Sequence, residues 1–358
     1  GGSFDVDSRV QAWFEIAYLS NGGAHAEGQA KRRMVEASLF GLFGPGTPSD
    51  TEAAAVVDFL TSDYAKEKIV SYENANNNPE QAAINDERFS HYATTIKGIT
   101  QALTPISDYI VKRYVSDSEL AGALANINFD NVVLGLIGLD TTRADKIAAA
   151  DHRVKNTNDL LVNVKEEDAT LSGGKGNDVL IGNSQKDTLL GLEDDDQLLG
   201  QGGDDILMGH SGEDKLYGDE GKDKLYASSD SDFSHTETDE LYGGKGEDEL
   251  YGDAGDDILD GGEDKDIMVG GKGDDTYTVD HVDDVVTEQE NEGEDTVLAK
   301  IDYELANDSH VENLILDEGV KRGTGSDSAN KITGNDGANI ISGGLGADKL
   351  YGGDGQDV

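Results

Sequence analysis

The stretch Gly-Gly-Lys-Gly-Asn-Asp-Val-Leu-Ile at residues 173–181 opens a series of nine-residue blocks that decides the fold. Further blocks begin at Gly182, Gly191, Gly200, Gly209 and Gly218, and, after an interruption, at Gly243, Gly252, Gly261 and Gly270. The interruption, residues 227–242, is sixteen residues long and therefore holds one block and a seven-residue insertion. Repetition at a short fixed period indicates a solenoid, because one block cannot bury its apolar residue alone, whereas stacked blocks bury a continuous ladder.

Two positions of the block are constant in character. Position six is aspartate in every regular block, namely Asp178, Asp187, Asp196, Asp205, Asp214, Asp223, Asp248, Asp257, Asp266 and Asp275. Position eight is large throughout, from Leu180 to Tyr277. Glycine at positions one, two and four permits φ > 0, so the first six residues are predicted to form a tight turn. The last three are predicted to be extended, with the middle side chain pointing inward.

Two blocks make one coil, so alternate blocks are expected to form two parallel sheets with aspartates in rows along each side. Carboxylates stacked at sheet spacing, roughly 4.8 Å, repel each other strongly unless a cation lies between them. Carboxylate and carbonyl oxygens in an adaptable turn favour Ca²⁺ over Mg²⁺, which requires stricter octahedral geometry. The sequence therefore predicts several calcium sites.

The pattern resembles the RTX (repeats-in-toxin, haemolysin-type calcium-binding) family, whose block is G-G-x-G-x-D-x-U-x with U large and apolar. This resemblance implies a parallel β-roll in which calcium lies between one turn and the turn two blocks later. The first turn would supply the carbonyls of positions two and four with the position-six carboxylate, and the later turn positions one, three and six. The predicted sets are Gly174, Gly176 and Asp178 with Gly191, Glu193 and Asp196; Gln201, Gly203 and Asp205 with Gly218, Glu220 and Asp223; Gly244, Gly246 and Asp248 with Gly261, Glu263 and Asp266; and Asp253, Gly255 and Asp257 with Gly270, Lys272 and Asp275.

Some blocks depart from the pattern. Gln185 stands where glycine is expected, and the next block has Leu192 and Asp194 in place of glycines, so turns starting there are expected to bind weakly or not at all. The insertion puts sites between Ala227 and Asp239 in doubt. Further predicted ligands, without a full set, are Asp187, Asp214, Asn339, Asp348 and Asp357.

The first array is assigned to residues 166–280. The region after it lacks the nine-residue period. Residues 281–322 are interpreted as a β spacer, with short strands expected at 277–279, 284–287, 296–298 and 313–316. The spacer is expected to continue the stack with longer coils; the alternative is a separate small β unit. A second array, 323–358, carries Asn330 and Asn339 at position six, and these amides are expected to bind calcium more weakly than carboxylates. The first residues, Gly1–Ser3, and a last block that stops at Val358 suggest a piece of a longer chain.

Residues 1–165 hold all four prolines and no nine-residue period, and are predicted to form an α-helical domain. Helices are expected at 7–18, 28–43, 53–72, 79–103, 105–115 and 117–125 from apolar spacing and capping residues. The apolar segment 131–139 is interpreted as a buried end of this bundle, and 156–168 as the connection to the roll. The complete prediction is thus a multidomain chain, with an N-terminal α-helical domain followed by a parallel β-roll.

One segment of this region carries a second resemblance. Gly28, Arg32, Arg33 and Glu36, followed by Leu39 and Phe40, are similar in spacing to the C-terminal signature of phage-type lysozymes. The resemblance covers only about residues 8–45, and no catalytic Glu…Asp…Thr arrangement occurs in this chain. The alternative is a solvated helix face on which Glu36 pairs with Arg32 and Arg33.

Composition narrows the function. Residues 1–165 contain 22 acidic and 15 basic residues, while 166–358 contain 52 and 13, so the acidity is concentrated in the repeats. This balance argues against nucleic acid as a partner, because phosphate binding needs clustered Lys and Arg. There is no cysteine nucleophile, no G-x-S-x-G and no H-E-x-x-H, and the seven histidines are interpreted as scattered surface residues. No membrane span or signal peptide is apparent.

The leading hypothesis is therefore a calcium-binding RTX region of a secreted bacterial protein, folding outside the cell and supporting an N-terminal helical effector domain. The resemblance implies export by the type I secretion machinery, and the absence of cysteine agrees with an extracellular protein exported unfolded. A monomer is expected. The alternatives are the C-terminal fragment of a secreted lysozyme-like peptidoglycan hydrolase, whose ligand would be peptidoglycan, or of an RTX adhesin or toxin that binds a protein or cell surface.

Overall fold

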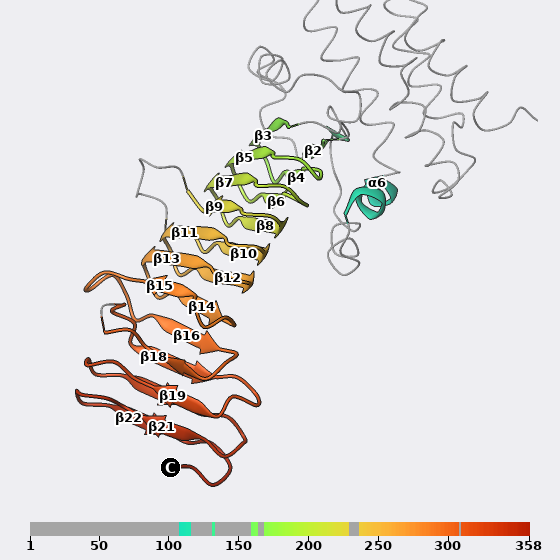
Figure 1. The fold of residues 1–358 in the computed structure, drawn as a ribbon. Helices are drawn as coiled ribbons and strands as arrows, with labels where there is room; N and C mark the ends of the chain where they lie inside the picture. The colour runs from blue at the N-terminus through green and yellow to red at the C-terminus, as the bar shows by residue number, and fades with distance from the viewer. Residues whose placement is uncertain (1–106, 116–130, 133–158, 164–167, 229–235, 308) are drawn as a thin grey trace, which may run out of the picture. The chain divides into compact units, whose positions relative to one another are not determined.

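The computed structural model of the protein describes residues 107–115, 131–132, 159–163, 168–228, 236–307 and 309–358 (Figure 1). The chain divides into two compact units. The first comprises residues 1–165 with 174–181, and the second 166–173 with 182–358. Each is considered by itself. Among the described residues, no helix has the length and apolar character needed to cross a membrane.

In the first unit the described elements are α6 (Ser107–Tyr114), β1 (Asn131–Val132), β2 (Asp159–Val162) and β4 (Val179–Ile181), and β3 (Thr170–Lys175) crosses the boundary between the units. α6 lies within the helix expected at 105–115, and Val111 is fully buried. The other expected helices, and the lysozyme-like segment 8–45, lie outside the described residues, so the helical domain as a whole is not supported. β1 pairs with β2 and β2 with β4, both in parallel. The segments expected to end a bundle and to connect it to the roll thus contain strands.

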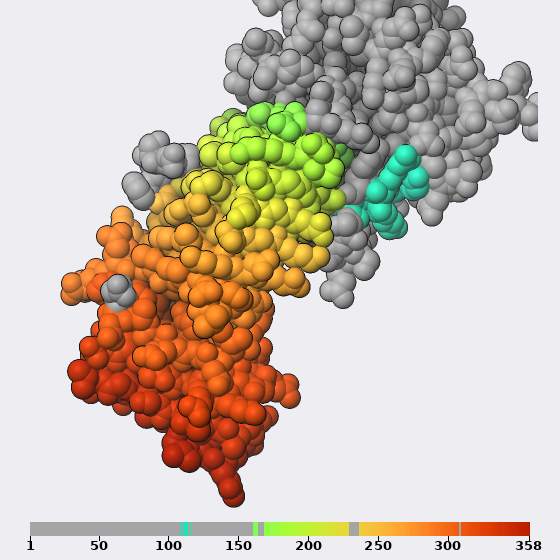
Figure 2. Space-filling model, in the orientation of Figure 1, coloured from blue at the N-terminus to red at the C-terminus, as the bar shows by residue number. Residues whose placement is uncertain are grey.

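The second unit is a parallel β-solenoid, as the repeat predicted. One sheet contains, in order, β6 (Gln197–Leu199), β8 (Lys215–Glu220), β10 (Glu240–Lys245), β12 (Ile258–Glu263), β14 (Thr276–Val279), β16 (Thr296–Ala299), β18 (Asn313–Leu316), β20 (Lys331–Thr333) and β22 (Lys349–Tyr351). The opposite side holds β5 (Thr188–Glu193), β7 (Ile206–Ser211), β9 (Lys224–Tyr226), β11 (Glu249–Ala254), β13 (Ile267–Lys272) and β15 (Val285–Thr287), and then a third sheet of β17 (Tyr303–Glu304), β19 (Arg322–Thr324) and β21 (Ile340–Ser342). The colour of this unit runs in sequence order from yellow-green to red (Figure 2).

The register is set by the block length. Leu189 pairs with Leu207 and Leu207 with Leu225, so like positions of alternate blocks stack on each other 18 residues apart. The position-eight side chains are the core that the sequence predicted. Those that are fully buried include Leu189, Leu198, Leu207, Leu216, Leu225, Leu250, Leu259, Met268 and Tyr277. Since burial of such a side chain stabilises the fold by about 1.5–3 kcal/mol, this ladder is the main apolar contribution to each coil.

The interruption of the repeat does not shift the register. β10 pairs with β8 and β11 with β9, with Leu241 opposite Leu216 and Leu250 opposite Leu225. Outward side chains also match across this junction: Tyr217 stacks on Tyr242 and Tyr226 on Tyr251, with ring centroids 5.0 Å apart in each pair. The block resumes in phase after 227–239.

The spacer continues the stack. All four expected strands are present as β14, β15, β16 and β18. Three of them, β14, β16 and β18, lie next to one another in one sheet with β20, while β15 pairs with β13 on the opposite side. The alternative of a separate β unit is therefore wrong. The expected longer coils are found only in part. Thr276 pairs with Thr296, so this coil has 20 residues instead of 18, but Thr296 pairs with Asn313, so the next coil has only 17.

Candidate metal centre

The position-six aspartates are linked into two rows by one repeated hydrogen bond. The main-chain N–H of each donates to Oδ1 of the aspartate one coil later. The donor and acceptor pairs are Asp187 with Asp205 (2.6 Å), Asp196 with Asp214 (2.7 Å), Asp205 with Asp223 (2.7 Å), Asp223 with Asp248 (2.8 Å), Asp248 with Asp266 (2.9 Å) and Asp257 with Asp275 (2.8 Å). All of these side chains are at most 1 % exposed. One carboxylate oxygen of each acceptor is therefore committed to the backbone.

The second carboxylate oxygen is different. It is buried and has no hydrogen-bond partner among the described residues in Asp205, Asp214, Asp223, Asp248, Asp257, Asp266 and Asp275. A buried charged oxygen without a donor is strongly unfavourable unless a cation compensates it. The rows are therefore suited to hold metal ions between successive turns.

The position-one glycines lie against these oxygens. A methyl group added at Gly252 would lie 2.5 Å from Asp257 Oδ2 and 2.7 Å from the carbonyl oxygen of Gly270. Glycine is thus required at position one by space, and not by φ > 0 as the sequence suggested. Left-handed backbone occurs at positions two and four, as at Gln201 (φ 78°) and Gly203 (φ 108°). The carboxylate oxygen and a carbonyl from the next coil converge on one point.

Three of the four predicted ligand sets are brought together across successive coils. In one, Gly203 N–H donates to Glu220 O (2.9 Å), while Gln201 O accepts from Glu220 N–H (3.1 Å). In the others, Gly246 N–H donates to Glu263 O (3.2 Å) and Gly255 N–H to Lys272 O (2.8 Å). A carbonyl has two lone pairs, so accepting one hydrogen bond leaves it able to bind a metal. The set of Gly174, Gly176 and Asp178 with Gly191, Glu193 and Asp196 divides between the two units and stays a prediction.

Burial makes these acids weak. It raises the pKa of Asp257 to about 9 and that of Asp205 to about 8, and neighbouring aspartates of the same row add to the effect. Asp248 is shifted less, to a pKa of about 6. Main-chain N–H donors oppose each shift without cancelling it. The rows therefore resist carrying their full negative charge without a bound cation.

A second kind of turn closes on itself. In it, the position-six side chain accepts a hydrogen bond from the main-chain N–H of position two in the same block. The pairs are Asn183 with Asp187 (2.8 Å), Asp280 with Asp284 (3.2 Å), Ser326 with Asn330 (2.7 Å) and Asn335 with Asn339 (2.9 Å). None of these position-two residues has φ > 0, unlike Gln201 or Asp253. Such a turn satisfies its own side chain.

This distinction bears on the remaining predicted ligands. Asp187 also accepts from Ala169 N–H through Oδ1 (2.7 Å), so both of its oxygens have backbone donors. The Asn339 amide donates to Val320 O (3.0 Å) as well as accepting from Asn335. Asp348 and Asp357 each accept a main-chain N–H, from Asn330 (3.0 Å) and Asn339 (2.9 Å). Metal roles for these four stay predictions.

Acidic residues outside the regular blocks also join the rows. Asp239 accepts from Asp214 N–H (2.7 Å) and donates its own N–H to Asp257 (2.8 Å), and burial raises its pKa to about 8. The sequence signal was present, because Asp239-Glu-Leu-Tyr repeats the D-x-L-Y of other blocks. Asp295 accepts from Asp275 N–H (2.9 Å). Glu288, which lies close to Asp275 and Asp295, has no counterpart in the repeat.

Comparison with known proteins agrees with this geometry. A family model described as the RTX calcium-binding nonapeptide repeat matches residues 166–198, 199–233, 238–277 and 324–358. A search of curated proteins found no match. The chain therefore carries four copies of the RTX calcium-binding nonapeptide repeat, folded as a parallel β-roll.

Proposed function

We propose that the β-roll binds several calcium ions and folds on binding them, as the calcium-responsive region of a secreted bacterial protein. The observation that carries this proposal is the set of buried Oδ2 atoms, from Asp205 to Asp275, that have no hydrogen-bond donor among the described residues. In Asp205, Asp214, Asp223, Asp248 and Asp257, this oxygen lies beside the position-one glycine of the same block, and a carbonyl oxygen from the next coil approaches that glycine as well. Carboxylates and carbonyls are the ligands that calcium prefers.

Folding and binding are expected to be coupled. Residues 166–358 contain 52 acidic and 13 basic residues, and compaction brings the aspartates into rows of like charge. That repulsion opposes folding, while an ion that binds only the folded rows stabilises them by mass action. At low calcium the extended chain is favoured, and at millimolar calcium the roll.

Such a switch suits a protein exported unfolded by the type I secretion machinery, since low calcium inside the cell keeps the chain extended. The complete absence of cysteine is compatible with this route. In this proposal the roll supports an effector domain in the N-terminal region, whose ligand is not assigned. Expression in a Gram-negative host with and without a type I exporter tests it, since export independent of the exporter would contradict the proposal.

Circular dichroism of the full chain tests the folding step. We expect little β-structure with a chelator, a cooperative gain with millimolar Ca²⁺, and a much smaller gain with Mg²⁺ at the same concentration. Equal β-content with chelator and with calcium would overturn the proposal.

A further inference from the structure

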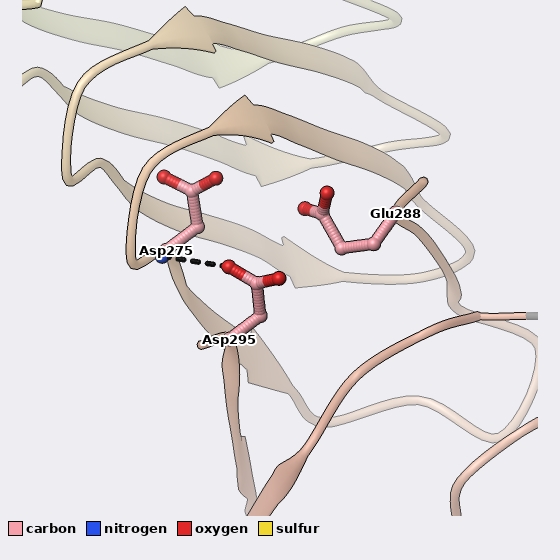
Figure 3. A group of neighbouring side chains, drawn as sticks. All are labelled: Asp275, Glu288 and Asp295. Carbon is pink, nitrogen blue, oxygen red and sulfur yellow. Dashed lines mark hydrogen bonds between the residues drawn. The ribbon is translucent and has the colours of Figure 1, made fainter. Parts of the chain in front are cut away.

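Three buried carboxylates meet where the first array passes into the spacer (Figure 3). Asp275 precedes β14, Glu288 directly follows β15, and Asp295 precedes β16. Their side chains are 1 %, 3 % and 1 % exposed. One oxygen from each lies within 4.8 Å of the other two. Around a calcium ion with ligands at 2.3–2.6 Å, two oxygens are at most about 5 Å apart, so this spacing fits one ion.

Glu288 occupies a place that the repeat reserves for glycine. β15 pairs with β13 so that Thr287 lies opposite Val269. The next residue, Glu288, is therefore equivalent to Gly270 in the preceding coil. In regular blocks a side chain here would collide with the position-six carboxylate, as at Gly252. Glu288 and Asp295 are seven positions apart, whereas Gly270 and Asp275 are five apart. The turn from Glu288 to Asp295 is thus two residues longer than a regular turn. This length leaves space for the Glu288 carboxylate at a position where a regular turn has glycine and offers only its carbonyl.

A second substitution orients Glu288. Position eight, leucine or methionine in the other regular blocks, is Tyr277, which is fully buried. Its O–H donates to Glu288 Oε1, and its oxygen accepts from Gly270 N–H at 2.6 Å. The phenol thereby holds one oxygen of Glu288 in the interior.

Two other oxygens of the group lack hydrogen-bond donors. Glu288 Oε2 and Asp275 Oδ2 are buried without a hydrogen-bond partner among the described residues, and both side chains are more than nine-tenths buried. Figure 3 shows the carboxylates turned toward one another, with Asp275 N–H donating to Asp295. Leaving two such oxygens unsatisfied has a high free-energy cost that a shared cation removes.

We propose that Asp275, Glu288 and Asp295 bind one calcium ion at a site that the nine-residue repeat encodes only in part, because Asp275 is a position-six aspartate whereas Glu288 and Asp295 lie outside the regular blocks. It differs from the repeat sites in having three carboxylates, one of them in place of a glycine carbonyl. More negative ligands bind calcium more tightly, so this site is expected to fill at lower calcium than the repeat sites. It lies at the junction of β14, β15 and β16, and therefore joins the first array to the spacer.

Calorimetric titration of the full chain with Ca²⁺ tests the site. We expect Glu288→Gln to bind one ion fewer than the unmodified chain and to lose its earliest phase. Glu290→Gln is the matched control. It removes the same charge, but Glu290 lies two residues further along the chain and its side chain is exposed. An unchanged ion count in Glu288→Gln would overturn the inference.

A measurement on the unmodified chain avoids dependence on how the variant folds. Crystals grown with Tb³⁺, a trivalent substitute for calcium, are expected to give an anomalous peak between Asp275, Glu288 and Asp295. Peaks in the repeat turns without one here would refute this site and leave the proposed function intact. Tb³⁺ peaks nowhere, together with no calcium bound in the titration, would refute both.

Discussion

The main-chain N–H of Asp214 donates to Oδ1 of Asp239 at 2.7 Å, although 25 residues separate the two. The corresponding bond from Asp205 to Asp223 has the same length and spans 18 residues. The row of hydrogen-bonded aspartates thus passes through the interruption of the repeat without a break. The seven additional residues change neither the register of β10 nor the burial of Asp239, which is 6 % exposed.

Removal of residues 229–235 is therefore expected to preserve the roll. The deletion leaves Ala-Ser-Thr-Glu-Thr-Asp-Glu-Leu-Tyr, a nine-residue block with Asp239 at position six and Leu241 at position eight. Calcium titration followed by circular dichroism should give the same β-content and a midpoint within about twofold. Deleting 243–249, also seven residues but from a regular block, is the control that should abolish the cooperative transition. Loss of the transition in the first deletion would contradict this reading of the insertion.

Asp257→Asn should weaken calcium binding, because Asp257 Oδ2 has no donor among the described residues and burial raises the pKa of Asp257 to about 9. Loss of one charged ligand is expected to cost about 1.5–3 kcal/mol, or roughly ten- to hundredfold in the affinity of that site. Asp256→Asn is the control, because Asp256 is next to Asp257 in the sequence and its side chain is exposed. The comparison is made by calcium titration, and equal affinities in the two variants would count against a ligand role for Asp257.

Asp187→Asn should behave differently, because both of its oxygens already accept main-chain N–H groups. We expect a fall in stability of about 1 kcal/mol from one lost hydrogen bond, with an unchanged number of bound ions. Thermal unfolding and calorimetric titration measure the two effects separately. A lower ion count would show that this turn binds calcium after all.

Gly200→Ala tests the steric role of position one. Its methyl group would meet Asp205 Oδ2 and lie 2.8 Å from the carbonyl oxygen of Gly218. Crowding of this kind destabilises by about 1–3 kcal/mol and should also lower calcium affinity. Gly202→Ala, where the nearest atom lies at 3.5 Å, should change the free energy of unfolding much less. Similar losses in both variants, measured by denaturant unfolding in calcium, would refute the steric argument.

Acid should partly replace calcium. In the folded roll, burial raises the pKa of aspartates in both rows, to about 6 for Asp248 and about 9 for Asp257, above the ordinary aspartate value of 3.8. The folded chain thus binds protons more tightly than the unfolded chain, so calcium-free stability rises as pH falls through this window and levels off below about pH 4. Circular dichroism in chelator should show more β-structure at pH 5 than at pH 8. Calcium affinity should fall over the same range, because protons compete for the carboxylates. No gain in β-structure on acidification would contradict the assigned pKa shifts.

The sequence predicted the ladder and the rows because a constant side chain at a constant period must stack on itself. Leu207 and Asp205 could be placed inward on that ground alone. The role of Gly252 could not, since its neighbours Asp257 and Gly270 are identified only once the coils are stacked. Glu288 was missed for the same reason: it lies thirteen residues from Asp275 in sequence, outside any repeat. The self-closed turn of Asn339 depends on the backbone at Asn335, which the sequence could not distinguish from Gln201, since both are polar residues at position two but only Gln201 has φ > 0.

The parallel stacking has a mechanical consequence. Each strand from β5 onward bonds only to the strands one coil before and one coil after it, so the hydrogen bonds run along the direction in which coils accumulate. A force along that direction loads one coil boundary at a time and peels the roll open in steps of 18 residues, each releasing roughly 60 Å of chain. In the reverse sense, each folded coil presents a complete edge on which the next can assemble. An ion held between two turns strengthens the boundary that must break in each step, so calcium concentration would set the load that the roll withstands.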